Sequence, residues 1–87
     1  MGFGAAIRRP PGMDIRLRVG ANLKALRVQR KLTQEDVSGL AQVDQTYLSG
    51  VENGKRNPSI RMLQKLADAL GVDPAELVRP LVKPDHK

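Results

Sequence analysis

The 87 residues are enough for one domain and too few for two, because a single core of this size is already only marginally stable. Apolar residues make up 40% of the chain and aromatic residues only 2%, so the core is built mainly from aliphatic side chains, which favours a helical bundle over a β-sandwich. The chain has no cysteine, which excludes disulfides, thiolate metal sites and cysteine nucleophiles.

The net charge of +6 is unevenly distributed along the chain. Residues 1–31 carry eight Lys or Arg against one acid, residues 32–52 carry four acids and no base, and the remainder carries seven bases against four acids. Basic flanks therefore enclose an acidic middle segment. Such flanks are typical of proteins that bind a polyanion, although ordinary solvated helix faces give a similar pattern.

The two ends of the chain differ from its middle. Residues 1–12 are rich in Gly and Pro and show no periodicity, so we expect a flexible arm or an extension derived from a cloning vector. The domain is expected over residues 13–80 and a C-terminal tail over residues 81–87. No apolar run approaches the roughly 20 residues of a membrane span, and the first residues do not frame a secretory signal. We therefore expect no membrane partner and a cytoplasmic, nucleoid-associated protein.

The first two helices are predicted from apolar spacing and capping residues. A helix is expected from Asp14 to about Arg30, because four apolar residues recur at helical spacing: Ile15, Val19, Leu23 and Leu26. Thr33 then has the character of an N-cap, with Asp36 three residues later as a variant of the capping box. The second helix is expected from Gln34 to about Gln42.

Three shorter helices are predicted to follow. Asp44 is a further N-cap, and the third helix is expected to end at the Asn53-Gly54 pair. The fourth helix follows the cap Ser59 and carries a clear apolar stripe as far as Gly71. The fifth is expected to run to about Arg79, with these start signals: Asp73 as N-cap, Pro74 as first helical residue and Glu76 as reciprocal acid.

The second and third helices are separated by only one or two residues, Gln42 and Val43, too few to reverse the chain into an antiparallel hairpin. They must therefore cross steeply, which is the helix-turn-helix arrangement. The third helix, roughly Asp44 to Asn53, then protrudes with Leu48 and Val51 turned to the core. Its outward side chains are small, polar and uncharged, and are suited to hydrogen-bonding base edges: Gln45, Thr46, Ser49, Gly50 and Asn53.

Three stretches carry a resemblance to a known family: Leu32–Val37, Thr46–Ser59 and Leu66–Val72. Their residues and spacing resemble the lambda-repressor-like, XRE-type helix-turn-helix family over about residues 14–79. The resemblance implies an all-α, five-helix DNA-binding domain of the kind found in phage repressors, restriction–modification controller proteins and antitoxins. It also implies a dimer on a palindromic operator in double-stranded DNA, where the protein excludes or recruits polymerase without a cofactor.

The resemblance implies a role for each matching position. Gln34 is expected to contact a phosphate and to brace the first base-reading side chain. Base reading is assigned to Gln45, Thr46 and Ser49, because an amide matches the donor and acceptor of adenine and a Thr methyl packs on a thymine methyl. Phosphate binding is assigned, besides Gln34, to six further residues: Tyr47, Asn53, Lys55, Arg56, Asn57 and Arg61.

Two further assignments concern the domain itself. Arg27 and Glu52 match a family pair that forms a salt bridge inside the domain, so we interpret them as structural. Four apolar residues are assigned to a two-fold dimer interface, which the family commonly places on its last helix: Leu77, Val78, Leu81 and Val82. The alternative is that Leu77 closes the core of a monomer.

Several positions depart from the family pattern. Lys31 and Gln42 stand where the family usually has glycine, and Ser38 stands where it has alanine. A left-handed Gln42 would cost about 1–2 kcal/mol, so either the turn differs here or the domain tolerates the strain. Gly50 leaves a gap where many relatives carry a base-reading side chain.

Two other classes of function are compatible with a chain of this size. An enzyme is not expected, because the single histidine, His86, lies in the tail and no His, Asp or Glu cluster has the spacing of a metal site or catalytic group. A protein-interaction module, such as an antitoxin in which a protein partner dominates over DNA, is favoured by the acidic segment 32–52. Bases on both sides of that segment favour double-stranded DNA instead.

Overall fold

The computed structural model describes residues 14–81, and within this range the regular structure is entirely helical. In chain order the helices are α2 (Ile15–Gln29), α3 (Gln34–Ala41), α4 (Gln45–Glu52), α5 (Ile60–Leu70) and α6 (Ala75–Val78). The expected all-α fold with five helices is confirmed for this part of the chain. The arm predicted over residues 1–12 and most of the predicted tail lie outside the described residues.

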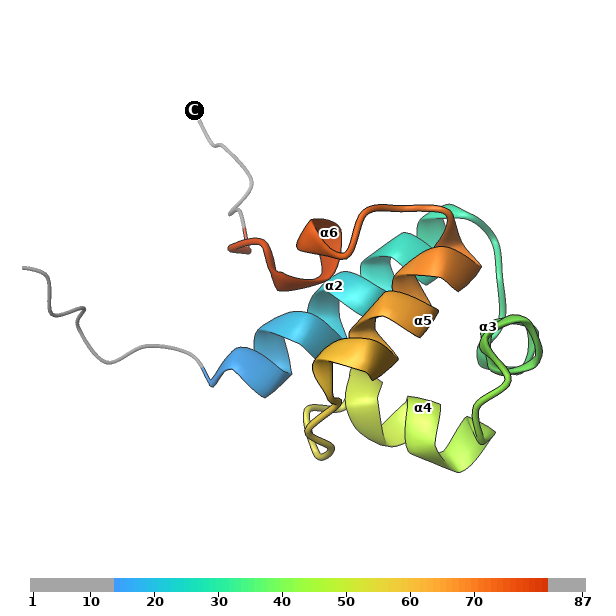
Figure 1. Ribbon diagram of the computed structural model, residues 1–87, viewed down its shortest axis with the longest axis horizontal. Helices are drawn as coiled ribbons and strands as arrows, with labels where there is room; N and C mark the ends of the chain where they lie inside the picture. Colours follow the sequence, from blue (N-terminus) through green and yellow to red (C-terminus); the bar gives the residue numbers. More distant parts are fainter. Residues whose placement is uncertain (1–13, 82–87) are drawn as a thin grey trace, which may run out of the picture.

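The helices pack around one aliphatic core. α2 packs against α4 and α6, and α3 packs against α4 and α5. Figure 1 shows α4 along the lower edge of the molecule and α3 nearly end-on at the right. In the same view α6 lies above α2, on the side away from α4. The core takes residues from every helix: Val19, Leu23, Val37, Ala41, Leu48, Val51, Leu66, Ala67, Leu70 and Leu77. None of the helices in residues 14–81 is long and apolar enough to span a bilayer.

The helix starts follow the predicted caps. The Thr33 hydroxyl accepts a hydrogen bond from the Asp36 backbone N–H at 3.0 Å, and the Asp36 carboxylate accepts one from the Thr33 N–H at 2.8 Å. This reciprocal capping box satisfies two N–H groups at the start of α3 that have no partner within the helix. Asp44 and Ser59 cap α4 and α5 in the predicted way.

The last helix differs from the prediction in its start. α6 begins at Ala75 with Pro74 as its N-cap, one residue later than predicted, although the Asp73 side chain accepts a hydrogen bond from the Ala75 N–H at 2.8 Å. The Glu76 carboxylate does not return to it, because it accepts a hydrogen bond from Arg79 at 2.7 Å. A one-turn helix places a cationic side chain three residues from Glu76, and that partner replaces the reciprocal cap.

Within residues 14–81, two residues other than glycine adopt left-handed backbone conformations. Lys31, which follows α2, has φ 59°, and Gln42, the C-cap of α3, has φ 58°. These are the two positions at which the family resemblance predicts glycine. Of the two alternatives considered for Gln42, the structure shows the strained turn.

Candidate nucleic-acid interface

The outer face of α4 is polar and uncharged. Leu48 and Val51 are buried against the core, and this orients the opposite face of the helix toward solvent. Gln45 and Thr46 are exposed, and Ser49 is half-buried. These three residues and the first residue of α3 line an open hollow of about 310 Å³: Gln34, Gln45, Thr46 and Ser49. The predicted base-reading residues therefore lie together, with Gln34 beside them.

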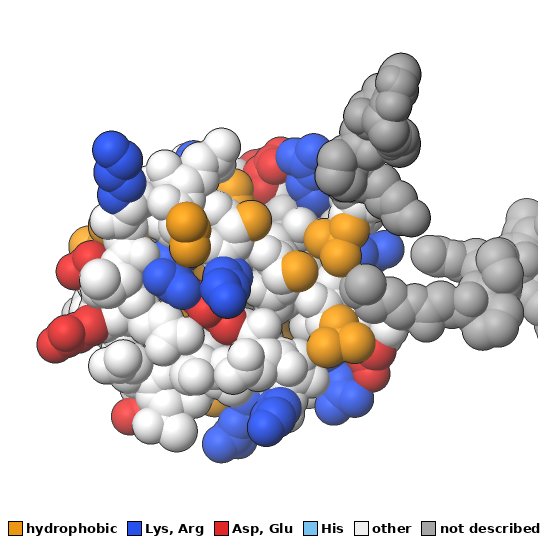
Figure 2. All heavy atoms as spheres, turned by 180° about the vertical axis from the view of Figure 1, so that it is seen from behind, with side chains coloured by type: hydrophobic (Ala, Val, Ile, Leu, Met, Phe, Trp, Pro, Cys, Tyr) orange, Lys and Arg blue, Asp and Glu red, His pale blue; other side chains and the backbone are white. Residues whose placement is uncertain are grey.

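Charged side chains lie around this polar face. Figure 2 shows uncharged side chains over the lower part of the molecule, where α4 lies, with Lys and Arg side chains in the middle of the face and along its lower edge. Asp and Glu side chains gather at the edge on the side of α3. The exposed residues assigned to phosphates lie after α4 or in the first turn of α5: Asn53, Lys55, Arg56, Asn57 and Arg61.

The Arg56 side chain covers part of α4. Its guanidinium carbon lies 5.6 Å from the centre of the Tyr47 ring, within the range of a cation–π interaction. A methyl group added at Gly50 would lie 2.7 Å from Arg56 Cγ. The gap expected at Gly50 is thus occupied by an arginine from the following loop. Sequence reasoning treated Arg56 only as one of several phosphate ligands and missed this packing.

The loop that carries Arg56 is fixed to the end of α4. The Lys55 N–H donates to the Gly50 carbonyl at 2.8 Å, and the Gly54 N–H donates to the Val51 carbonyl at 3.1 Å. Gly54 has φ 75°, and a Cβ there would collide with a methyl carbon of Leu17 on α2. Both the positive φ and the nearby Leu17 side chain favour glycine at this position, and the resulting turn orients the basic residues that follow.

A buried ion pair joins α2 to the end of α4. Arg27 Nε lies 2.6 Å from Glu52 Oε2, Arg27 Nη2 lies 3.0 Å from Glu52 Oε1, and the two side chains are only 12% and 3% exposed. The hydrogen bond to Glu52 raises the pKa of the Arg27 guanidinium above its already high value. Arg27 Nη1 also donates to the Leu32 carbonyl at 2.8 Å, so one side chain links α2, the following loop and α4.

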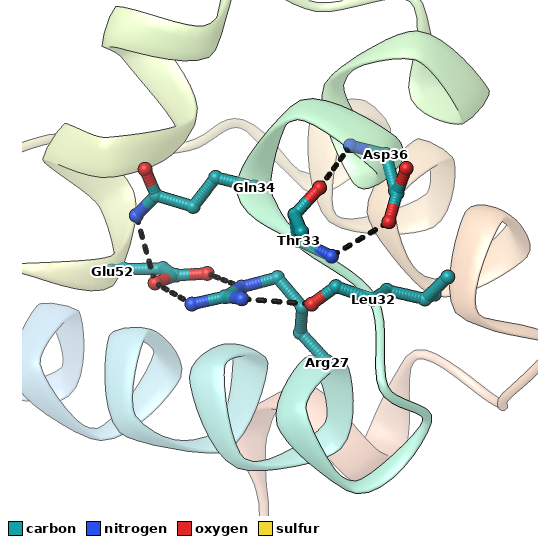
Figure 3. Close-up of polar contacts among 6 residues, drawn as sticks. All are labelled: Arg27, Leu32, Thr33, Gln34, Asp36 and Glu52. Atoms are coloured by element: carbon teal, nitrogen blue, oxygen red, sulfur yellow. Dashed lines mark hydrogen bonds and ion pairs between the residues drawn. The ribbon is translucent and has the colours of Figure 1, made fainter.

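Gln34 belongs to the same network, which the sequence did not predict. Its side-chain Nε2 donates to Glu52 Oε1 at 3.0 Å. Figure 3 shows the Gln34 amide reaching across from the start of α3 to Glu52 on α4, with the Arg27 guanidinium on the other side of the carboxylate. The residue assigned to a phosphate contact is therefore held by a buried carboxylate.

The four residues assigned to a dimer interface fall into different environments. Leu77 is fully buried in the core, which agrees with the alternative that it closes the monomer. Val78 and Leu81 are 36% and 40% exposed, and Val82 lies outside the described residues. Leu81 lines a groove of about 630 Å³ beside α2, whose small or apolar lining residues include Ala21, Ala25 and Val28.

In Figure 1 α3 is seen nearly end-on and α4 along its length, so the two helices cross steeply and, with the polar face of α4, define a protein of the helix-turn-helix class. The Helix-turn-helix family model HTH_3 matches residues 23–77. The chain therefore belongs to this family. The relatives that it resembles are transcriptional regulators and controller proteins rather than enzymes.

Individual relatives agree with this family. The uncharacterized HTH-type transcriptional regulator y4dJ of Sinorhizobium fredii is 48% identical over 68 residues, which cover 78% of this chain and 88% of the relative. The restriction–modification controller protein C.AhdI of Aeromonas hydrophila is 40% identical, with a TM-score of 0.70 over 71% of this chain and 94% of that one. The C.Esp1396I controller protein, solved as a tetramer with its natural 35 base-pair operator, is 29% identical, with a TM-score of 0.69 over 76% of this chain and 87% of that one.

Proposed function

We propose that the protein binds double-stranded DNA in a sequence-specific manner and regulates transcription, with α4 lying in the major groove. The observation that carries this proposal is the exposed, uncharged polar face of α4 next to the basic residues of the loop after it. A major groove admits one helix, and its base edges offer hydrogen-bond donors and acceptors to such side chains. The C.Esp1396I relative, solved on its operator, supports the same use of the fold.

The side chains divide into two roles in this proposal. Gln45, Thr46 and Ser49 read bases, because they line the hollow on the outer face of α4. The residues of the α4–α5 loop and of the first turn of α5 bind phosphates, which supplies affinity and register: Asn53, Lys55, Arg56, Asn57 and Arg61. Tyr47 contributes through its ring, which packs against the Arg56 guanidinium. Gln34 contacts a phosphate through a backbone N–H at the start of α3.

A second part of the proposal is a homodimer on a palindromic operator. One recognition helix reads few base pairs, whereas two helices about 34–36 Å apart match successive major grooves. The exposed Val78 and Leu81, together with the groove beside α2, supply the contact surface among the described residues. Val82 is assigned to the interface from the sequence alone. Sedimentation of Leu81→Asp against the parent chain tests this part, because a charged residue in the interface should shift the protein to monomers. Unchanged dimers in that variant contradict the interface.

A protein-interaction module is the alternative proposal. One observation favours it: Leu40 on α3 is 60% exposed and lies in a shallow hollow that also takes Glu35 and Asp36. An apolar side chain beside two acids suits a protein surface better than DNA. In this alternative the face around Leu40 binds a protein partner, and the chain has only weak, non-specific affinity for DNA.

Selection of bound fragments from a randomised duplex pool, followed by binding at several salt concentrations, tests the main proposal. A shared sequence in the selected pool is expected, with affinity falling by roughly one power of salt per phosphate contact. Lys55→Ala should flatten this salt dependence by about one power. Lys65→Ala is the matched control, since it removes the same charge from an exposed site in the hollow between α3 and α5. A pool without any preferred sequence contradicts sequence-specific binding.

A further inference from the structure

The orientation of the Gln34 amide is determined by its neighbours. Glu52 Oε1 accepts hydrogen bonds from Gln34 Nε2 and from Arg27 Nη2, both at 3.0 Å, while Glu52 Oε2 accepts from Arg27 Nε at 2.6 Å. An ionised carboxylate only accepts hydrogen bonds. The Gln34 NH₂ group must therefore face Glu52, and the amide oxygen must point away from it, as Figure 3 shows.

This orientation has a consequence for the α4 face. Gln34 lines the same hollow as Gln45, so the group that it offers beside the base-reading residues is a hydrogen-bond acceptor. A free glutamine side chain would offer either its oxygen or its NH₂ group, because the two ends of the amide differ little in shape. In this protein the orientation of the Gln34 amide is fixed by the Glu52 carboxylate, whose side chain is 3% exposed and is held by Arg27.

We propose that the Arg27–Glu52 pair sets the direction of the Gln34 amide and thereby the base that Gln45 prefers. With an acceptor beside it, Gln45 turns one N–H toward Gln34. Its second N–H and its oxygen then face the groove and match N7 and the N6 amine of adenine. Glu52 and Arg27 are positioning residues in this account, in addition to holding α2 and α4 together. The inference rests on the proposed DNA-binding function.

Base preference measured by selection from randomised duplexes tests the inference, with the full chain and three variants. Gln45→Ala identifies the base pair that Gln45 reads, because preference is lost there alone. Gln34→Met keeps the length of the side chain but removes the amide. Glu52→Gln removes the carboxylate that fixes the orientation of the Gln34 amide. Both variants should lose adenine preference at that base pair, by roughly fivefold or more, since a bidentate amide discriminates by roughly 5- to 140-fold.

The double variant distinguishes positioning from a structural role. If Glu52 acts on base choice only through Gln34, Glu52→Gln changes no base preference in the Gln34→Met background. A merely structural role lowers the melting temperature and weakens binding to all sequences alike. Gln64→Met, the same exchange at an exposed position of α5, is the matched control and should leave the selected sequence unchanged.

The results for the parent chain and its variants separate the proposed function from the positioning inference. A parent chain that selects no sequence contradicts the proposed function. A parent chain with a clear site, whose Gln34→Met and Glu52→Gln variants keep the adenine preference that Gln45→Ala loses, overturns the positioning inference while the function stands. Circular dichroism at the assay temperature shows whether Glu52→Gln is folded. If it is not, Gln34→Met alone decides, because that side chain is only half-buried at the start of α3.

Discussion

The Ser38 hydroxyl donates a hydrogen bond to the Val43 carbonyl, across the turn that joins α3 to α4. The Val43 N–H returns a hydrogen bond to the Ser38 carbonyl at 3.0 Å. Between them Gln42 has φ 58° and ψ 49°, a conformation in which a side chain is strained. The serine that departs from the family pattern thus reinforces the turn in which glutamine replaces glycine.

Ser38→Ala should lower the free energy of unfolding by about 1 kcal/mol, the net value of a typical intramolecular hydrogen bond. The half-buried Val43 carbonyl loses its side-chain partner in this variant, while the backbone hydrogen bond remains. Urea denaturation of the parent and the variant measures the difference. An unchanged midpoint shows that water replaces the hydroxyl without loss.

Gln42→Gly should raise the free energy of unfolding by about 1 kcal/mol, because glycine adopts the left-handed conformation without strain. The gain is reduced by the greater freedom of glycine in the unfolded chain. Gln42→Ala is the control: it removes the same side chain but keeps the strain, so it should give no increase. Thermal melts of the three proteins decide, and equal gains for glycine and alanine attribute the effect to the side chain instead.

The prediction of helices succeeded where local signals were strong. Thr33, Asp44 and Ser59 cap their helices as expected, because a short polar side chain before an apolar stripe meets backbone N–H groups only a few residues away. The last helix was predicted less well, since it spans one turn and is held by tertiary contacts. Asn22 on α2 donates to the carbonyls of Leu77 and Arg79 at 3.0 and 2.9 Å, which sequence spacing does not reveal.

The capping box makes stability depend on pH. Hydrogen bonds from Thr33, first its backbone N–H, lower the pKa of the Asp36 carboxyl in the folded protein. A lowered pKa means that the contribution of Asp36 is complete above its unfolded pKa of about 4 and is lost as the pH falls through the lower folded value. Asp36→Asn should therefore weaken the loss of thermal stability on acidification.

Melting temperatures measured between about pH 6 and pH 2.5 check this dependence over the range in which carboxyl groups titrate. Glu35→Gln is the control, because Glu35 is an exposed neighbour that lies outside the capping box. Its melting temperature should fall with pH as steeply as that of the parent. Equal slopes for the parent and Asp36→Asn would show that the capping carboxylate does not contribute to the acid sensitivity.

Gly50→Ala should separate DNA binding from stability. The new methyl group would lie 2.7 Å from Arg56 Cγ, so the exposed arginine must leave its place on α4 and its contact with the Tyr47 ring. We expect weaker DNA binding, whereas helix propensity favours alanine over glycine by up to about 1 kcal/mol. A gel shift together with a thermal melt measures both effects. Arg56→Ala is the matched variant, and a Gly50→Ala protein that binds as well as the parent contradicts a role for the position of Arg56.

The sequence predicts which residues form the site more completely than it predicts the contacts between them. The outward set on α4 follows from helical periodicity once Leu48 and Val51 are assigned to the core. The Gln34–Glu52 hydrogen bond and the packing of Arg56 on Gly50 depend on how two elements meet, and periodicity within one element contains no such information. The sequence indicates a missing side chain at Gly50, but it contains no signal that Arg56 fills the space.

Glu52→Ala should lower the free energy of unfolding by about 3–5 kcal/mol, because removal of one partner leaves a buried charge without compensation. The remaining Arg27 side chain is 12% exposed, and Gln34 loses its acceptor as well. Such a loss is a large part of the roughly 5–15 kcal/mol that stabilise a natural domain. Glu76→Ala is the control, since its partner Arg79 lies at 2.7 Å on the surface and such pairs contribute less than about 1 kcal/mol. Urea denaturation with equal losses for the two variants would mean that burial of the Arg27–Glu52 pair does not determine its contribution.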